Sequence, residues 1–571
     1  MSALFPSFSV VLTSSRVASK PSLLPPASHK TDAFRNRYNV IHQRLLRNEA
    51  FQTATVTNAR SAGLRRGGSE ALQSQKITPI ANLLGRHGTN HMLLGMLNIL
   101  PTGNLAISDL TSTITLDLSH TVAIPEDSAW FAPGMIVLID GVYEEEEESV
   151  GKGLSGSSGV GGTIGGRFQG FFIGQPPCEK RQATLGVSGL DGGADHTIGG
   201  GFGWIDFLGV GSARAVGSRM RKVEQRLLRQ PALADPDSPG RGRVVVVGEL
   251  NLDQPRSLQA LKKILSLYAT DPEGSTPMTF VLAGNFTSHA VMARGGSGGS
   301  IEYKEFFDAL ASTLADFPML LTTATFVFVP GDNDGWASSF SGGAALPLPR
   351  KSVPDLFTSR IRRVFAAANA EAGLSSTEGK GGEAIWTTNP SRLSLFGPNH
   401  EIVLFRDDIS ARLRRSSVRL KTKTLITPSQ PDNEEDTTMS GASNNNPGPS
   451  SPADDAMDID NTTNAATSAL SNDTLTARKL VRTLLDQGYL APFRQSIRPV
   501  HWDYTAPLSL YPLPTALVLV DTSAPPFYVT YAGCHVMNPG SVLVGGRRGV
   551  ARWVEYAVGS GGGGRVRECT F

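Results

Sequence analysis

The sequence has few cysteines, little net charge and no long apolar run. Its three cysteines, Cys178, Cys534 and Cys569, lie far apart without a CxxC pair. This argues against a disulfide framework and a zinc knuckle, and it indicates a reducing compartment, nucleus or cytosol. No apolar run reaches the roughly 18 residues that cross a bilayer, so we expect no membrane contact. The 53 basic and 51 acidic residues give a net charge of +2, too small to make nucleic acid a partner of the whole surface.

The apolar content is sufficient for more than one core. With 571 residues and a hydrophobic share of 40%, the chain is expected to form two or three domains. Residues 1–31 are rich in Ser and Pro, which predicts a disordered tail in preference to a transit peptide.

Residues 32–60 are predicted to form an amphipathic helix and a linker. Asp32 can cap the start of the helix. Apolar residues then recur at helical spacing: Phe34, Tyr38, Ile41 and Leu45. We expect the apolar face of this helix to dock on another surface.

Residues 75–235 are predicted to form an OB-fold domain. Short β-like segments with turn signals recur at 91–100, 105–110, 114–118, 135–143 and 167–173. The Gly-rich stretch 151–166 contains a GxGxxG match, but it follows an acidic run instead of a strand, so we interpret it as a loop. A helix predicted at 212–229 carries many arginines, which indicates a solvated face or, alternatively, a surface for phosphates or an acidic partner.

Residues 243–571 are predicted to form a layered α/β domain. Buried strands at 244–247, 279–283 and 324–330 alternate with helices at 257–268 and 303–314. The polar ends of these strands should gather along one edge of the sheet. Residues 424–472 contain almost no large apolar side chains, so they are expected to be a disordered insertion in this domain.

The polar strand ends and one later segment resemble the motifs of calcineurin-like metallophosphoesterases. The segments are GELN at 248–251, GNFTS at 284–288, GDND at 331–334 and GCHVMNPGS at 533–541. That family holds two metal ions with Asp-x-His, Gly-Asp-x-x-Asp, Gly-Asn-His-Asp/Glu and Gly-His-x-His, because carboxylates and imidazoles bridge the ions and generate a hydroxide.

Most of those ligands are replaced here. Glu249 stands at the first Asp, Asn251 at its His, and Asn285 at the bridging Asp. The resemblance therefore implies a vestigial site formed by Glu249, Asn251, Asn285, Asp332, Asn333, Asp334, Cys534 and His535.

Asp332 and Asn333 stand at the Asn and the catalytic His, while Cys534 and Val536 take two His positions and flank His535. Neutral amides are weak ligands for divalent ions, so we expect no catalytic residues, no metal and no cofactor. The plainer interpretation is that these Asn and Asp side chains shape loop turns. A metal-dependent phosphodiesterase with an altered site is the alternative.

The motifs as a set resemble the B subunits of eukaryotic replicative DNA polymerases, and within that group those of DNA polymerase epsilon. The segments that carry the resemblance are FRNRYNVIHQRLLRNEAF (34–51), ITPIANLLGR (77–86), GWIDFLG (203–209), FVLAGNFTS (280–288), FVFVPGDNDGW (326–336), IVLFRD (402–407), RPVHWDY (498–504), LYPLP (510–514) and NPGS (538–541). The resemblance implies an α/β, multi-domain fold: an OB-type β-barrel followed by an inactivated calcineurin-like phosphoesterase β-sandwich flanked by helices.

The resemblance also implies a function. Such a protein is a nuclear, non-catalytic scaffold that binds the metal-containing C-terminal domain of the catalytic subunit and the other epsilon subunits, and meets DNA through the complex. Members usually begin with a helical module that contacts the replicative helicase. Residues 1–30 show no such helices, so a helicase contact is not carried over. Single-strand binding by the barrel is a third hypothesis, in which Phe168, Phe171 and Phe172 would stack on bases.

Overall fold

The computed structural model describes residues 25–51, 75–145, 163–184, 242–272, 275–291, 299–335, 346–374, 381–396, 400–420, 472–559 and 563–571. The predicted helix 212–229, Trp336 and the insertion up to residue 471 lie outside these residues. Within them, no helix is both long and apolar enough to cross a membrane.

The N-terminal half forms a closed β-barrel. Its strands are β1 (Asn90–Ile99), β2 (Leu105–Ser108), β3 (Thr113–Asp117), β4 (Val122–Ala123), β5 (Ile136–Glu144) and β6 (Thr163–Gly174). They are ordered β3-β2-β1-β5-β6, and β3 also pairs with β6 in parallel, which closes the barrel. The five predicted strands are thus confirmed, whereas the two-residue β4 beside β6 was not predicted.

The barrel is filled by alternate residues of its strands. Along β3, Ile114 and Leu116 are buried and alternate with the partly exposed Thr113, Thr115 and Asp117, as expected for a strand with one apolar face. Phe168 lies in the core, while Phe171 and Phe172 are 37% and 45% exposed. β6 begins at Thr163, so the last residues of the predicted Gly-rich loop 151–166 are strand, because they pair with β3.

The C-terminal half is a sandwich of two sheets. The first sheet has the order β10 (Ala384–Trp386), β9 (Thr325–Val329), β8 (Thr279–Ala283), β7 (Arg243–Val247), β16 (Val550–Ala557) and β17 (Gly564–Thr570). The second has the order β11 (Ser391–Leu395), β12 (His400–Arg406), β13 (Ala516–Val520), β15 (Cys534–Asn538) and β14 (Phe527–Tyr531). Their facing surfaces share one core, in which Val246, Val281 and Val327 pack with Leu404 and Val518.

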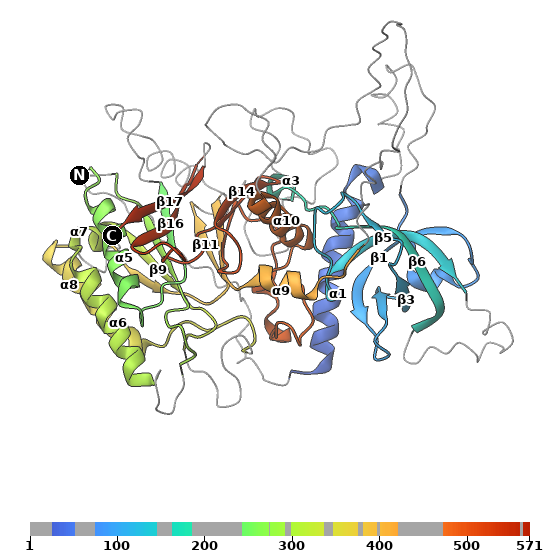
Figure 1. The fold of residues 1–571 in the computed structure, drawn as a ribbon, viewed down its shortest axis with the longest axis horizontal. Coiled ribbons are helices and arrows are strands. Elements are labelled where there is room, and N and C mark those ends of the chain that lie inside the picture. The colour runs from blue at the N-terminus through green and yellow to red at the C-terminus, as the bar shows by residue number, and fades with distance from the viewer. Residues whose placement is uncertain are drawn as a thin grey trace, which may run out of the picture.

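Helices cover the outer faces of the sandwich. The first sheet is covered by α5 (Pro255–Ala269), α6 (Ser300–Ala315), α7 (Pro318–Thr323) and α8 (Asp355–Glu371), whose apolar residues form a second core with it (Figure 1). Strands β7, β8 and β9 are therefore buried on both faces, which explains their unbroken apolar sequences. The predicted fold class, a barrel followed by a helix-flanked sandwich, is confirmed.

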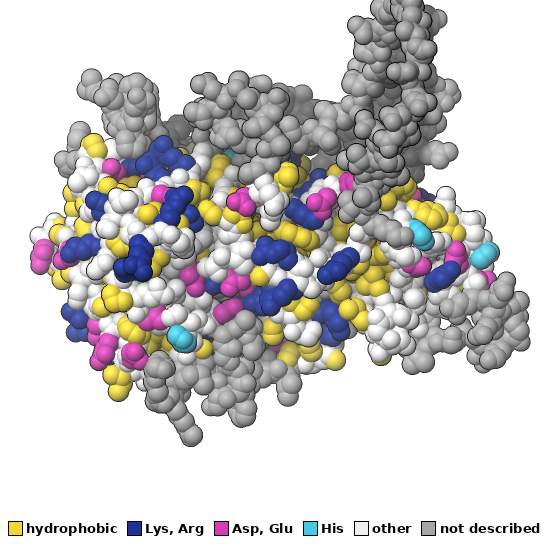
Figure 2. Space-filling view, in the orientation of Figure 1, with side chains coloured by type: hydrophobic (Ala, Val, Ile, Leu, Met, Phe, Trp, Pro, Cys, Tyr) yellow, Lys and Arg dark blue, Asp and Glu magenta, His cyan; other side chains and the backbone are white. Residues whose placement is uncertain are grey.

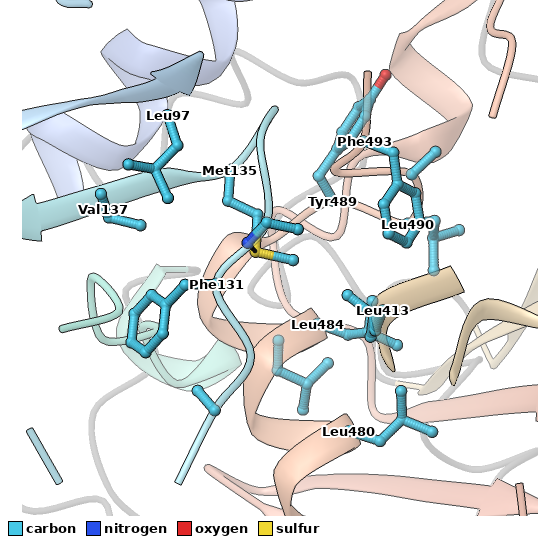
Figure 3. Close-up of a cluster of buried hydrophobic side chains, with 14 of the residues drawn as sticks. Leu97, Phe131, Met135, Val137, Leu413, Leu480, Leu484, Tyr489, Leu490 and Phe493 are labelled. Carbon is cyan, nitrogen blue, oxygen red and sulfur yellow. Dashed lines mark hydrogen bonds between the residues drawn. The ribbon is translucent and has the colours of Figure 1, made fainter. Parts of the chain in front are cut away.

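A single core joins the barrel to the second sheet. Helices α9 (Ile409–Ser416) and α10 (Asn472–Gln487) cover the outer face of that sheet, and their side chains meet the barrel. Figure 3 shows Met135 of the barrel directed toward Leu413 of α9 and Leu484 of α10, and Phe131 belongs to the same core. Gln487 at the end of α10 accepts a hydrogen bond from the Ile136 amide at 2.9 Å and donates one to its carbonyl at 2.6 Å.

The first helix docks on its own chain. Helix α1 (Ala27–Leu46) follows Pro26, so residues 27–31 are helical and not part of the predicted tail. Asp32 pairs with Arg35 inside the helix instead of capping it. The apolar face of α1, with Ile41 and Leu45, packs on the barrel strands.

An adjacent side of α1 reaches the sandwich half. The Arg44 guanidinium donates to the carbonyl oxygens of Pro176 at 2.7 Å and Asp486 at 2.6 Å. Figure 1 shows α1 standing between the barrel and the sandwich. The helix therefore holds both halves of the chain together.

Candidate functional site

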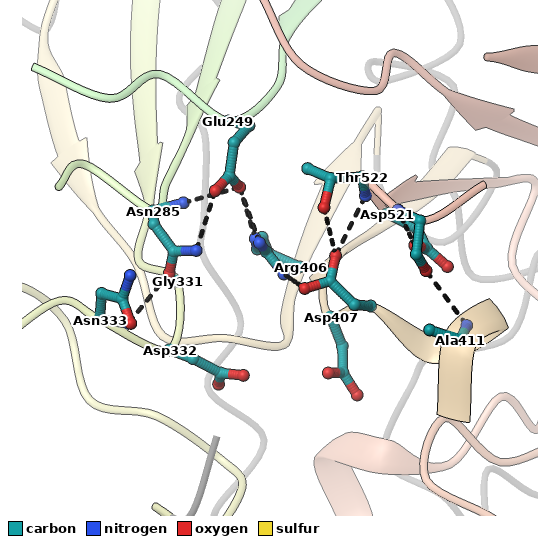
Figure 4. Close-up of polar contacts among 12 residues, drawn as sticks. Glu249, Asn285, Gly331, Asp332, Asn333, Arg406, Asp407, Ala411, Asp521 and Thr522 are labelled. Atoms are coloured by element: carbon teal, nitrogen blue, oxygen red, sulfur yellow. Dashed lines mark hydrogen bonds and ion pairs between the residues drawn. The ribbon is translucent and has the colours of Figure 1, made fainter. Parts of the chain in front are cut away.

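Three strand ends of the first sheet gather at one edge, as predicted. Because β7, β8 and β9 are parallel, Glu249, Asn285 and Asp332 follow their strands at the same edge (Figure 4). All three residues are at least 90% buried. Their chemistry is therefore set by the protein groups around them and hardly by solvent.

Glu249 is held by two kinds of donor. Its carboxylate accepts hydrogen bonds from the Asn285 amide N–H at 3.1 Å and from the Asn285 side chain at 2.9 Å. Arg406, at the end of β12 in the second sheet, donates from Nε to Glu249 Oε2 at 2.8 Å. Glu249 also has a φ of 45°, a left-handed conformation that few non-glycine residues adopt. Its carboxylate is thus fully engaged by protein groups.

The side chains of Asn285 and Asn333 form hydrogen bonds between two loops of this edge. The Asn285 side-chain oxygen accepts from the Asn333 amide N–H at 2.9 Å. The Asn333 side chain donates to the carbonyl oxygens of Thr287 and Ser288 at 3.0 and 3.1 Å. These amides connect the loop after β8 to the loop after β9.

Asp334 lies deepest among the predicted residues of this edge, with 1% of its surface exposed. It accepts hydrogen bonds from the amides of Gly331 and Phe286 at 2.7 and 3.0 Å and from the Tyr303 hydroxyl at 3.1 Å. Burial raises the pKa of Asp334 to about 6, although these donors oppose the shift. Asp334 is therefore a structural acceptor beneath the edge.

Asp332 belongs to a buried group of two carboxylates and two arginines. Arg498 Nη2 lies 2.6 Å from Asp332 Oδ1, and Arg412 Nη2 lies 2.9 Å from Asp407 Oδ1. Burial raises the pKa of Asp407, with Arg498 and Arg412 opposing the shift. Burial disfavours the charged form of Arg498, but Asp407 and Asp332 outweigh it and raise its pKa. The four charges are mutually compensated.

The arginines of this edge were not predicted as site residues. Arg406 and Asp407 end the apolar segment IVLFRD, and Arg498 begins RPVHWDY. A charged pair directly after a buried strand was the available signal, since such side chains emerge at a sheet edge. Pairing them with Glu249 and Asp332, which lie 157 and 166 residues away, required the packing of the two sheets.

Cys534 and His535 do not reach this edge, which corrects the sequence interpretation. They begin β15, which runs parallel to β13, so they lie at the opposite end of the second sheet from its carboxyl edge. Cys534 is fully buried in the core that joins the barrel to the sandwich. His535 Nδ1 lies 2.7 Å from the Tyr528 hydroxyl. The segment 534–538 is a strand, and only its end, Asn538, reaches the carboxyl edge beside Asp521.

Asn251 lies near the edge without joining the network. Its amide N–H donates to the Glu249 carbonyl at 3.1 Å, and its buried side-chain oxygen has no hydrogen-bond partner. Across the residues that the structure describes, no three His, Cys, Asp or Glu side chains are grouped so that they could hold a metal ion. The carboxylates of Glu249 and Asp332 are each paired with an arginine and the neighbouring side chains are amides, a set that does not fit a two-metal centre.

Comparison with known proteins shows to which family this chain belongs. The family model for the B subunit of DNA polymerase alpha/epsilon matches residues 244–529, and the model of the DNA polymerase epsilon subunit 2-like OB-fold domain matches residues 27–177. The DNA polymerase epsilon B subunit of Saccharomyces cerevisiae is 31% identical over 547 residues, which cover 94% of this chain and 68% of that protein. The chain belongs to the family of DNA polymerase epsilon B subunits.

Other members are similarly related. The epsilon B subunit of Schizosaccharomyces pombe is 31% identical over 525 residues, 92% of this chain and 68% of its own length. DNA polymerase epsilon subunit 2 of Mus musculus is 25% identical over 523 residues, 91% of this chain and 73% of its own length. The OB-fold match of this family begins at residue 27, so it includes α1 together with the barrel.

Proposed function

We propose that this protein is a non-catalytic accessory subunit of a nuclear DNA polymerase epsilon complex. In this role it scaffolds the C-terminal domain of the catalytic subunit and contacts the other epsilon subunits. Family membership supports the assignment, because the related proteins are named as subunits of that polymerase. DNA is then met through the complex.

The observation that carries the non-catalytic role is the arginine-filled edge. Arg406 is bound to Glu249, which stands at the first metal-binding Asp of the phosphoesterase motifs, and Arg498 is bound to Asp332, which stands at their Asn. A phosphoesterase needs the side chains at both positions to be free to bind metal ions. We infer that the phosphoesterase-like site, Glu249, Asn251, Asn285, Asp332, Asn333 and Asp334, is vestigial. Its side chains hold loops and sheets in place.

The surface is suited to a protein partner. On the face shown in Figure 2, Lys and Arg side chains are interspersed with Asp and Glu and with apolar side chains. A surface of mixed charge gives little steering toward a polyanion. The shared core between barrel and sandwich further presents both halves as one rigid body for a partner to bind.

Co-expression tests the scaffold role. The full chain, expressed with the C-terminal domain of a polymerase epsilon catalytic subunit, should elute with it as a stable one-to-one complex on size exclusion. Elution of the two proteins in separate peaks would contradict the proposal. An unrelated zinc-binding domain of similar size serves as the control for non-specific association.

A hydrolysis assay tests the absence of catalysis. The purified chain with excess Mn²⁺ should not hydrolyse a chromogenic phosphodiester above the buffer rate. The Asp332→Ala variant provides the matched control, because it removes a side chain of the edge without introducing the Asn that the phosphoesterase motif carries at this position. Hydrolysis by the wild type that this substitution abolishes would establish an enzyme instead.

A further inference from the structure

Arg406 occupies the space between two carboxylates that come from different parts of the sandwich. Its Nε and Nη2 both lie 2.8 Å from Glu249 Oε2, and its Nη1 lies 3.3 Å from Asp408 Oδ2. Glu249 follows β7 of the first sheet, and Asp408 follows β12 of the second. The Arg406 side chain is only 2% exposed and Glu249 11%, so water does little to screen their attraction, whereas Asp408 is 38% exposed and its attraction is partly screened.

Arg498 likewise lies between two carboxylates, those of Asp332 and Asp407. Its Nη2 lies 2.6 Å from Asp332 Oδ1, after β9 of the first sheet, and its Nε lies 3.5 Å from Asp407 Oδ2, after β12. Arg412 assists from α9, with Nη2 at 2.9 Å from Asp407 and 3.7 Å from Asp332. The Arg498 and Asp407 side chains are both 0% exposed.

We propose that Arg406 and Arg498 are built-in cations that clamp the carboxyl edges of the two sheets together. Each guanidinium binds one carboxylate from each sheet, as a bridging metal ion would, so the edge is closed without a metal. The inference rests on the proposed non-catalytic role of this edge, and it explains that role by arginines that occupy the place of metal ions. A planar guanidinium suits this task because its fork of donors can engage two carboxylates at once.

Removing Arg406 alone should be more destabilising than neutralising Arg406 together with its two carboxylate partners. Burial disfavours the charged form of Arg406, but Glu249 and Asp408 outweigh it and raise its pKa. Without Arg406, the Glu249 carboxylate, which is only 11% exposed, would contact the amide donors of Asn285 and would lose this cation. Removing one partner of a buried pair is far more damaging than replacing the whole pair with neutral groups.

Thermal unfolding of the full-length chain tests the clamp. The variant Arg406→Met keeps much of the side-chain volume without the charge, and it should lower the unfolding midpoint by roughly 10 °C. Neutralising both partners in the same chain, as Arg406→Met/Glu249→Gln/Asp408→Asn, should recover most of that loss. The control Arg552→Met removes an arginine that pairs with the one-third exposed Glu568 at 2.8 Å. It should lower the midpoint by about 3 °C or less.

The outcomes separate the clamp from simple packing. If Arg406→Met fails to fold while the triple variant folds, the clamp is supported. A triple variant as unstable as Arg406→Met would overturn it, because the lost volume and not the charge would then matter. So would a wild-type midpoint that rises with excess Mn²⁺ and falls with EDTA. Failure of the wild-type chain to bind the catalytic subunit's C-terminal domain would count against the proposed function. It would not affect the comparison of unfolding midpoints between Arg406→Met and the triple variant.

Discussion

Replacing Arg44 with methionine should weaken the attachment of α1 to both halves of the chain. Arg44 is only 5% exposed and donates from Nη2 to the carbonyl oxygens of Asp486 at 2.6 Å and Pro176 at 2.7 Å. Pro176 follows the last barrel strand, while Asp486 belongs to α10 of the sandwich half. One side chain thus connects three segments that are far apart in sequence.

The size of the effect follows from these contacts. A hydrogen bond from a charged donor contributes about 1.5–3 kcal/mol, and the substitution leaves two buried carbonyl oxygens without this donor. Part of the loss is offset, because burial disfavours the charged guanidinium and lowers the pKa of Arg44. We therefore expect Arg44→Met to reduce the free energy of unfolding by about 3 kcal/mol.

Denaturant unfolding of the full-length chain measures this loss. The matched control is Arg35→Met on the same helix, whose side chain is 55% exposed and pairs with Asp32 at 3.0 Å. An exposed pair of this kind contributes at most about 0.5 kcal/mol. If the two variants unfold at the same denaturant concentration, the reasoning about the buried contacts of Arg44 is wrong.

Three further substitutions test other parts of the structure by denaturant unfolding. Asp334→Asn should remove a pH dependence: with a folded pKa of about 6 against an ordinary 3.8, the folded chain binds more protons than the unfolded chain. The wild type should therefore lose about 3 kcal/mol relative to this variant as the pH rises through that window, and parallel pH curves would contradict the burial argument. Gly248→Ala should cost about 2 kcal/mol, because its Cβ would lie 2.2 Å from the Gly540 oxygen, whereas Gly165→Ala meets nothing within 4 Å and should be nearly neutral. Gln487→Ala should cost about 2 kcal/mol by leaving the Ile136 amide and carbonyl unpaired, and a loss no larger than that of Thr476→Ala on the same helix would refute this.

Most of the local structure could be predicted from the sequence. Unbroken apolar runs identified β7, β8 and β9, because strands covered on both faces need apolar side chains on both. Alternation identified the barrel strands, and helical spacing identified α1. The polar residues after the parallel strands identified the edge that holds Glu249, Asn285 and Asp332, since the ends of parallel strands meet.

Strand identity was harder to predict where polar residues interrupt the pattern. β16 carries Arg552 and Glu555, yet it lies between β7 and β17 in the first sheet. The residues 534–538 matched a metal motif in sequence but form β15, which places Cys534 and His535 at the far end of the sheet. Local spacing gives no sheet order, because pairing depends on contacts between distant segments.

The side chains that fill the polar edge depend on the packing of the two sheets and could not be predicted from local sequence patterns. Arg406 and Arg498 reach Glu249 and Asp332 because the two sheets pack face to face, which brings together residues 157 and 166 positions apart. Those charges are compatible with burial only as pairs, since each alone would lack solvent and a counter-ion. The sequence predicted that the usual metal ligands are replaced, and the packing of the two sheets shows that arginines pair with Glu249 and Asp332 at this edge.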